Sequence, residues 1–163
     1  MVEVHYPPAK PFINKRSFKI FLAGTIDQGN SIDWQKLMIK EIEKHFPEGN
    51  IDIMNPRRPD WDSSWENDPC HPMFKAQVNW ELDQLDNADL IIMVLLEESI
   101  SPVSMLELGY LKDRRMLVFN PEEFHLYGNV EIFCRRNNIP SFHDWDDYLI
   151  SINRYIRTSL LNY

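Results

Sequence analysis

The feature that most constrains the fold is a continuous apolar run, ADLIIMVLLE, at residues 88–97. A run of this kind is typical of a strand buried on both faces, as in a parallel sheet covered by helices. Three shorter β-rich runs predict further strands at residues 17–25, 50–56 and 115–120.

Helical patterns separate these runs, at residues 31–46, at 73–88 and around Glu107. The remaining chain is a mixed tail with a helical pattern over residues 147–161. Strands that alternate with helices in this way predict an α/β fold, with a parallel sheet and helices on both faces.

The length of 163 residues fits one domain. Residues 1–16 contain three prolines and mixed charge, so we expect an N-terminal extension without a regular element, lying along the surface. The domain itself is then expected over residues 17–163.

Charge and composition limit the partners. The formal net charge is −8, which disfavours a nucleic-acid polymer or an anionic membrane and leaves room for a small ligand held by a few arginines. The chain opens without a signal-peptide pattern and has no apolar run long enough to span a membrane. Cys70 and Cys134 stand alone, as expected for free thiols. We expect a cytoplasmic protein.

Ligands of parallel α/β sheets bind beyond the carboxyl ends of the strands. This rule selects residues 23–27, 55–62 and 97–107 and the loop after Asn120. Glu107 therefore falls in the expected ligand region, although it lies among apolar residues in SPVSMLELGYL.

Two glutamates are candidates for chemistry. Glu107 is expected early in its helix, where the dipole favours an ionised carboxylate suited to nucleophilic attack. The alternative is a glutamate that completes a helix terminus. Glu81 lies next to the apolar face of the helix over residues 73–88, whereas Asp83 and Asp86 are expected to face water. Retaining glycosyl transfer uses a pair of carboxylates about 5 Å apart. Carboxylates on a helix, however, usually belong to the face that is exposed to solvent.

The segment NPRRPDWDSSW supports two interpretations. Arg57 or Arg58 can donate paired hydrogen bonds to a carbonyl or phosphate, and Trp61 or Trp65 can stack on a flat base. Alternatively, the segment is a surface loop pinned by tryptophan burial and Arg–Asp pairs.

The sequence shows no recognisable motif for a dinucleotide-binding, metal-binding or serine-hydrolase site. The AGT that follows the first strand has neither dinucleotide-binding nor Walker spacing. The histidines show no metal-binding spacing, and no serine has a recognisable His–Asp partner motif. Neither a metal site nor a serine-hydrolase site is expected.

Several segments together resemble the nucleoside 2-deoxyribosyltransferase superfamily, and specifically its nucleoside 2-deoxyribosyltransferase-like branch. They occur in the order of that family and are IFLAGTID, Trp34, NPRRPDWD, QVNWELDQLDNADLIIMVL, SPVSMLELGYL and GNVEIFCRR. The resemblance implies a single flavodoxin-like (Rossmann-like) domain and homo-oligomers with sites near subunit interfaces.

The resemblance also implies roles for single residues. Glu107, in the ELG motif, would be the nucleophile that forms a covalent sugar–enzyme intermediate. Glu81, eight residues before Asp89 of the AD pair, would be the acid/base group that contacts the base. Asn129 would reach the sugar of a neighbouring subunit.

Two positions depart from the better-studied members of the family. Phe21 stands where they have a tyrosine that bonds the nucleophile, and Ser101 where they have an aspartate that binds the sugar. Related deoxynucleotide hydrolases hold a 5′-phosphate with serines here, and Ser101 and Ser104 offer the same groups.

We therefore expect an enzyme that exchanges the base of 2′-deoxynucleosides without a cofactor, for nucleotide metabolism or salvage. The alternatives are an N-glycoside hydrolase acting on 5′-mononucleotides or NAD-like nucleotides, and a nucleotide-binding protein without catalysis. The catalytic candidates are Glu107 and Glu81. The substrate-binding candidates are Phe21, Gly24, Asp27, Arg57, Arg58, Asp60, Trp61, Asp89, Ser101, Ser104 and Asn129.

Overall fold

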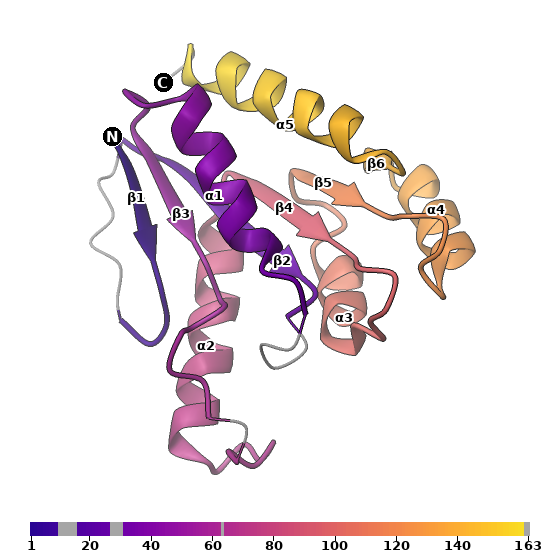
Figure 1. Cartoon of the computed structure of the whole chain (residues 1–163). Helices are drawn as coiled ribbons and strands as arrows, with labels where there is room; N and C mark the ends of the chain where they lie inside the picture. The colour runs from indigo at the N-terminus through magenta and orange to yellow at the C-terminus, as the bar shows by residue number, and fades with distance from the viewer. Residues whose placement is uncertain (10–15, 27–30, 63, 162–163) are drawn as a thin grey trace.

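A computed structural model of the chain describes residues 1–9, 16–26, 31–62 and 64–161. In these segments six strands form one parallel sheet in the order β1-β3-β2-β4-β5-β6 (Figure 1). The strands are β1 (Val2–His5), β2 (Phe18–Gly24), β3 (Ile51–Met54), β4 (Leu90–Val94), β5 (Met116–Phe119) and β6 (Ser141–Phe142).

Five helices in the described segments cover the two faces of the sheet: α1 (Trp34–His45), α2 (Pro72–Asn87), α3 (Pro102–Tyr110), α4 (Tyr127–Arg136) and α5 (Trp145–Leu160). The helices α1 and α5 pack on one face, and α2, α3 and α4 on the other (Figure 1). Without β1, the strand order is that of flavodoxin-like folds. The expected fold class is therefore confirmed.

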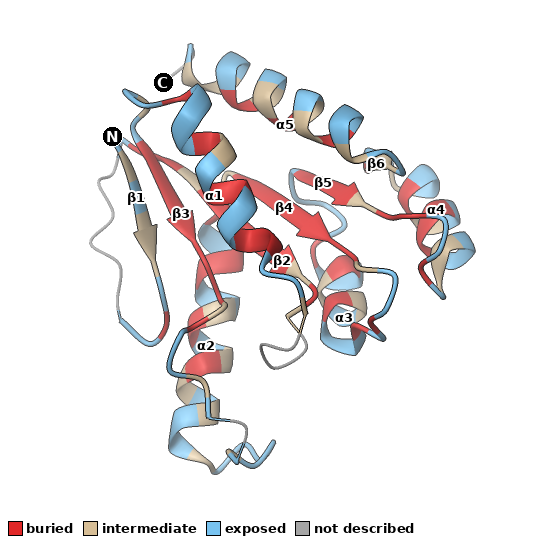
Figure 2. Ribbon diagram, in the orientation of Figure 1, coloured by how far each residue is buried: buried red, intermediate tan, exposed pale blue. Residues whose placement is uncertain are grey.

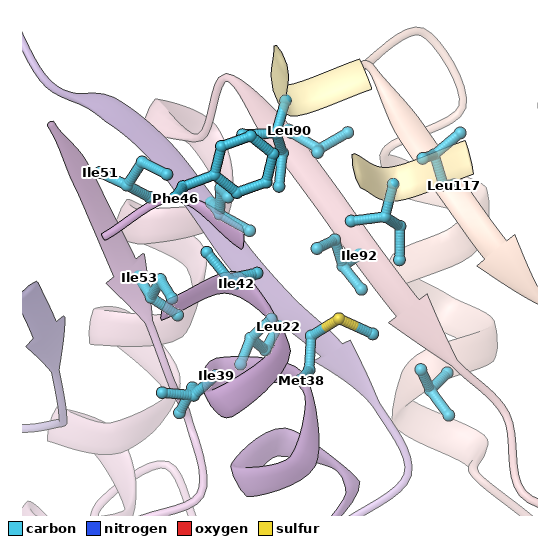
Figure 3. Close-up of a cluster of buried hydrophobic side chains, with 14 of the residues drawn as sticks. Leu22, Met38, Ile39, Ile42, Phe46, Ile51, Ile53, Leu90, Ile92 and Leu117 are labelled. Atoms are coloured by element: carbon cyan, nitrogen blue, oxygen red, sulfur yellow. The ribbon is translucent and has the colours of Figure 1, made fainter. Parts of the chain in front are cut away.

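Each face of the sheet has its own apolar core, because successive side chains of a strand point to opposite faces. On the first face, Leu22 and Ile92 meet Met38 and Ile42 of α1 (Figure 3). On the second face, Phe21 and Met93 meet residues of α2, α3 and α4. All five residues of β4 are fully buried, which explains its unbroken apolar sequence (Figure 2).

The amino-terminal segment differs from the prediction. Residues 2–5 form the edge strand β1, whose partner along its whole length is β3. The alternation Val2-Glu3-Val4-His5 was too short to indicate a strand, and only pairing with β3 gives its backbone groups partners. The expectation that residues 1–16 contain no regular element was wrong.

The carboxyl-terminal tail is also more regular than predicted. Besides α5, which matches the predicted helical pattern, it contains α4 and the two-residue strand β6. The buried hydroxyl of Tyr148 lies 2.9 Å from the carbonyl oxygen of Met93 and 3.1 Å from that of Leu117, so α5 is anchored to both β4 and β5. No helix of the described residues has the length and apolarity needed to cross a membrane.

Gly24 allows β2 to turn at the ligand edge of the sheet. Its φ of +123° is a conformation that other residues rarely adopt, and a Cβ atom there would lie 2.1 Å from the carbonyl oxygen of Val94. The next amide, that of Thr25, donates to the same oxygen at 2.9 Å. The close approach of these two strands therefore depends on the missing side chain.

We predict that Gly24→Ala lowers the free energy of unfolding by more than about 2 kcal/mol, because it combines backbone strain with a clash against rigid backbone. Urea denaturation followed by circular dichroism measures this. Gly109→Ala is the matched control, since an added Cβ meets nothing within 4 Å there, and it should be neutral or stabilising by up to about 1 kcal/mol. Equal stability of Gly24→Ala and the wild type would contradict this explanation.

Candidate functional site

The candidate site lies where β2 and β4 end, side by side. From β2 the chain crosses to β3 on one side, and β4, β5 and β6 follow on the other, so the strand order reverses between β2 and β4. Ligands of open α/β sheets bind at such a reversal, beyond the carboxyl ends of the strands. The arrowheads in Figure 1 mark this edge.

A cluster of buried hydroxyl groups occupies this edge. Thr25 Oγ1 and Ser101 Oγ lie 2.6 Å apart, and Ser101 Oγ and Ser99 Oγ lie 2.8 Å apart. The Leu96 amide donates to Thr25 Oγ1 at 3.1 Å. Ser104, one turn into α3, is also buried. The cluster therefore links the end of β2 to the loop before α3.

Ser101 is held in a conformation unusual for serine. It precedes α3 with φ 45° and ψ 49°, in the left-handed region, and its side chain makes no capping hydrogen bond to the helix. Its amide donates to Ser99 Oγ at 3.1 Å instead. Residues in this region carry backbone strain and are found preferentially at ligand and active sites. The hydroxyl cluster stabilises this strained turn.

Glu81 lies on α2 beside the sheet. Gln77, one turn earlier, donates from Nε2 to Glu81 Oε1 at 2.6 Å and to the carbonyl oxygen of Pro56 at 3.0 Å. Burial raises the pKa of the Glu81 carboxyl to about 7, although the Gln77 hydrogen bond acts in the opposite direction. Gln77 thus connects Glu81 to the loop after β3.

Glu107 lies in the second turn of α3, and its backbone carbonyl belongs to the last turn, where it accepts from the Leu111 amide. Burial, together with the smaller effect of the nearby charge of Glu81, raises the pKa of its carboxyl to about 8. The predicted stabilisation of the ionised form by the helix dipole is wrong, because the effect is limited to the first turn and burial outweighs it.

The structure thus brings Glu81 and Glu107 into one poorly solvated environment. Two carboxyls that repel each other's charge lose their protons in two steps that belong to the pair. With pKa values of about 7 and about 8, the pair retains at least one proton through most of the neutral range. One carboxylate beside one carboxylic acid is the state that acid-assisted nucleophilic substitution needs.

The two arginines after β3 have different surroundings. Arg57 donates to the carbonyl oxygens of Ser31 at 2.9 Å and Ile32 at 3.2 Å, and so fixes the segment before α1. Arg58 is buried and forms a double hydrogen bond to exposed Asp60, with both distances 2.7 Å, which lowers the pKa of that carboxyl. These contacts agree with the interpretation of a pinned loop.

Three polar atoms in this region are buried without a hydrogen-bond partner among the described residues: Arg58 Nη1, Trp61 Nε1 and Gln77 Oε1. Trp61 packs edge-on against Trp65 at 5.1 Å between ring centroids, and the Arg58 guanidinium lies 4.9 Å from the Trp65 ring. Unpaired buried polar atoms are rare in folded proteins, and a ligand is one explanation for them.

Other predicted site residues are not brought together here. Asp89 precedes β4 and accepts from the Lys19 amide at 2.8 Å, so it lies at the opposite edge of the sheet from Gly24 and Ser101. Phe21 is buried in the second core, 6.3 Å from the Trp80 ring. Asn129 is exposed near the start of α4, and Asp27 lies outside the described residues.

The sequence analysis does not name three residues that the structure places at the site: Thr25 and Ser99, which lie in the segments selected as the ligand region, and Gln77. Thr25 belongs to the AGT segment that was considered only as a phosphate loop. Gln77 is four residues before Glu81, a spacing that places both side chains on one helix face. Apart from its place in residues 97–107, nothing in the sequence singles out Ser99, because its contact with Ser101 depends on the turn that the loop adopts.

We predict that the stability of the protein falls as the pH rises from 5 to 8. A carboxyl with a raised pKa binds its proton more tightly in the folded than in the unfolded chain, so its loss destabilises the fold. Glu107→Gln should therefore be more stable than the wild type at pH 8, by at least about 1 kcal/mol, and differ little at pH 5. Urea denaturation at both pH values measures the difference.

The control is Glu43→Gln, which removes an exposed carboxyl of α1. Its stability should follow that of the wild type at both pH values. If Glu107→Gln showed no gain at pH 8 relative to pH 5, folding would not raise the pKa of this carboxyl.

Comparisons with known proteins place this geometry in context. No curated protein matches the sequence. The fold is similar to the crystal structure of a conserved protein from Enterococcus faecalis V583, with a TM-score of 0.63 at 16% identity over 85% of this chain and 99% of the other. That likeness concerns the fold alone. Residues 17–124 match the family described as nucleoside 2-deoxyribosyltransferase like. The chain therefore belongs to the nucleoside 2-deoxyribosyltransferase-like family.

Proposed function

We propose that this protein cleaves the N-glycosidic bond of a 2′-deoxynucleoside and transfers the deoxyribosyl group to a second base. The observation that carries the proposal is the pair Glu81 and Glu107, two partly buried carboxyls at the ligand edge of the sheet, with the charge of Glu81 acting on Glu107. Family membership supports the same class of chemistry.

In the proposed reaction, the Glu107 carboxylate attacks C1′ while Glu81 gives its proton to the departing base. The C1′–N bond breaks with its electron pair going to the base nitrogen, and a glycosyl ester forms on Glu107. An incoming base then attacks C1′, loses its proton to Glu81 and releases Glu107. The carboxyls supply the nucleophile and the proton, so no cofactor enters the scheme.

The proton must be on Glu81 when the reaction starts. Without substrate the proton belongs to the pair, and the Gln77 hydrogen bond favours the ionised form of Glu81. A base nitrogen or carbonyl oxygen that accepts a hydrogen bond from Glu81 favours its protonated form instead. Substrate binding would therefore prepare the pair for attack.

The unpaired atoms of the loop after β3 support a role in holding the base. Arg58 Nη1 and Trp61 Nε1 are donors and Gln77 Oε1 is an acceptor, and each lacks a partner among the described residues. In this proposal a small movement of the loop presents these atoms to the polar edge of the base. Asn129 of a neighbouring subunit would complete the sugar site in a homo-oligomer.

We predict that Glu107→Ala lowers base exchange by at least about 10³-fold, because it removes the nucleophile. Glu81→Gln should lower it by about 10²- to 10⁴-fold through loss of proton transfer. Chromatography of thymidine, deoxycytidine and deoxyadenosine incubated with adenine measures new deoxynucleosides. Asp83→Asn, an exposed carboxyl on the same helix as Glu81, should retain full activity. Exchange by Glu107→Ala at the wild-type rate would overturn the proposal.

The pH dependence of the exchange gives a separate prediction. Activity needs one proton on the pair, so the rate should be greatest around pH 7 to 8 and fall on either side, as the pKa values of about 7 and about 8 imply. The Glu81→Gln variant should lose the alkaline decline, since the proton on Glu81 is no longer required. A profile that is flat from pH 5 to 9 would contradict a role for the pair.

The hydroxyl cluster favours a second candidate, a hydrolase that acts on a 5′-mononucleotide. Ser99, Ser101 and Ser104 are buried together at the amino end of α3, and hydroxyl groups with a helix N-terminus are suited to a phosphate. The same assay with 5′-monophosphates distinguishes the two. Free base released without an acceptor, and lost in Ser101→Ala and Ser104→Ala, would favour the hydrolase.

A further inference from the structure

Three metal-ligating side chains meet at the β1 edge of the sheet, away from the candidate site: Glu3, His5 and Asp52. Glu3 is paired in register with Asp52, and His5 follows two residues later, so all three point to the same face of the sheet. The contributing strands, β1 and β3, lie side by side in Figure 1. The ligand atoms of the three side chains lie within 4.8 Å of one another.

The buried member of the trio is already oriented. Asp52 is 3% exposed; its Oδ1 lies 2.7 Å from His5 Nε2, and its Oδ2 accepts a hydrogen bond from the Ser17 hydroxyl. Protein groups that ligate a metal through carboxylates are commonly fixed by a second hydrogen bond of this kind. Because the Ser17 hydroxyl holds Oδ2 of Asp52, the other carboxylate oxygen, Oδ1, remains directed at His5.

We propose that Glu3, His5 and Asp52 bind a divalent first-row transition metal such as Zn²⁺. One imidazole nitrogen and two carboxylate oxygens are a ligand set that suits such ions, and water completes the coordination. The ion takes the place of the proton between His5 Nε2 and Asp52 Oδ1. Ligand atoms about 2 Å from a common metal lie roughly 3 to 4 Å apart, so small rotations of the side chains are sufficient.

The simpler alternative is a His5–Asp52 hydrogen bond that needs no ion. Glu3 separates the two explanations. Its side chain is exposed and forms no hydrogen bond or ion pair within the described segments, so the apo fold does not depend on it. A metal site gives Glu3 a part as the third ligand, whereas a simple His5–Asp52 hydrogen bond leaves it outside the cluster.

A bound ion would attach the amino-terminal strand to the sheet. The strand β1 has four residues and pairs only with β3 in the described structure. Binding to the folded state alone raises stability by mass action. The metal is assigned no part in the chemistry of Glu81 and Glu107, so this inference stands independently of the proposed function.

Isothermal titration of the full, untagged chain with Zn²⁺ tests the proposal, after treatment with EDTA and dialysis. We expect one ion per chain, and a rise in Tm of about 5 °C or more at 100-fold excess over Kd, reversed by EDTA. Glu3→Gln should weaken binding at least 10-fold while the Tm of the metal-free protein stays unchanged. His5→Gln should weaken binding more strongly, since it removes the nitrogen ligand.

The matched control is His45→Gln, which removes a histidine that also pairs with a single carboxylate, that of Glu41 at 3.2 Å, but without a third ligand. It should bind Zn²⁺ as the wild type does. Absence of saturable heat in the wild type would overturn the proposal. So would unchanged affinity in Glu3→Gln, or a loss of binding in His45→Gln equal to that in His5→Gln.

Discussion

The complete burial of β4 is the constraint from which the rest of the architecture follows. A strand with no solvated face needs a helix layer on each side and a paired strand along each edge. Its neighbours are β2 and β5, and the parallel connections place all carboxyl ends at one edge. The loops that carry Thr25, Ser101 and Arg58 consequently meet there, although they are far apart in the sequence.

The strands and helices predicted from the sequence are present in the structure wherever burial requires a regular pattern of apolar residues. β2 and β4 carry apolar side chains on both faces, and α1 carries a stripe that packs onto Leu22 and Ile92. β1 and β6 left no such pattern, because four and two residues are too few to show a period and their pairing depends on the sheet already present.

The sequence indicated several of the residues that belong to the candidate site, but it did not indicate their pKa values or the backbone conformation that surrounds them. Glu81 and Glu107 were selected because carboxyls beside apolar residues are costly unless used, and because of the family resemblance. Both pKa values are raised by burial, and that of Glu107 also by the approach of Glu81, and the sequence records neither effect. The strained turn at Ser101 likewise emerges only from the packed strands. The location of Asp89 away from the site agrees with its place at the amino end of the predicted strand.

The short outer strands bear on how the protein behaves at high concentration. A long, flat edge strand offers unpaired backbone groups to other chains and invites aggregation through strand addition. Here one edge ends in the two-residue β6, and the other in β1, which carries Glu3 and His5. A second molecule would gain few hydrogen bonds at β6 and would face a charged side chain at β1. Because both outer strands are short, they leave no clear pattern in the sequence. For the same reason they offer little backbone to which a second molecule could add a strand.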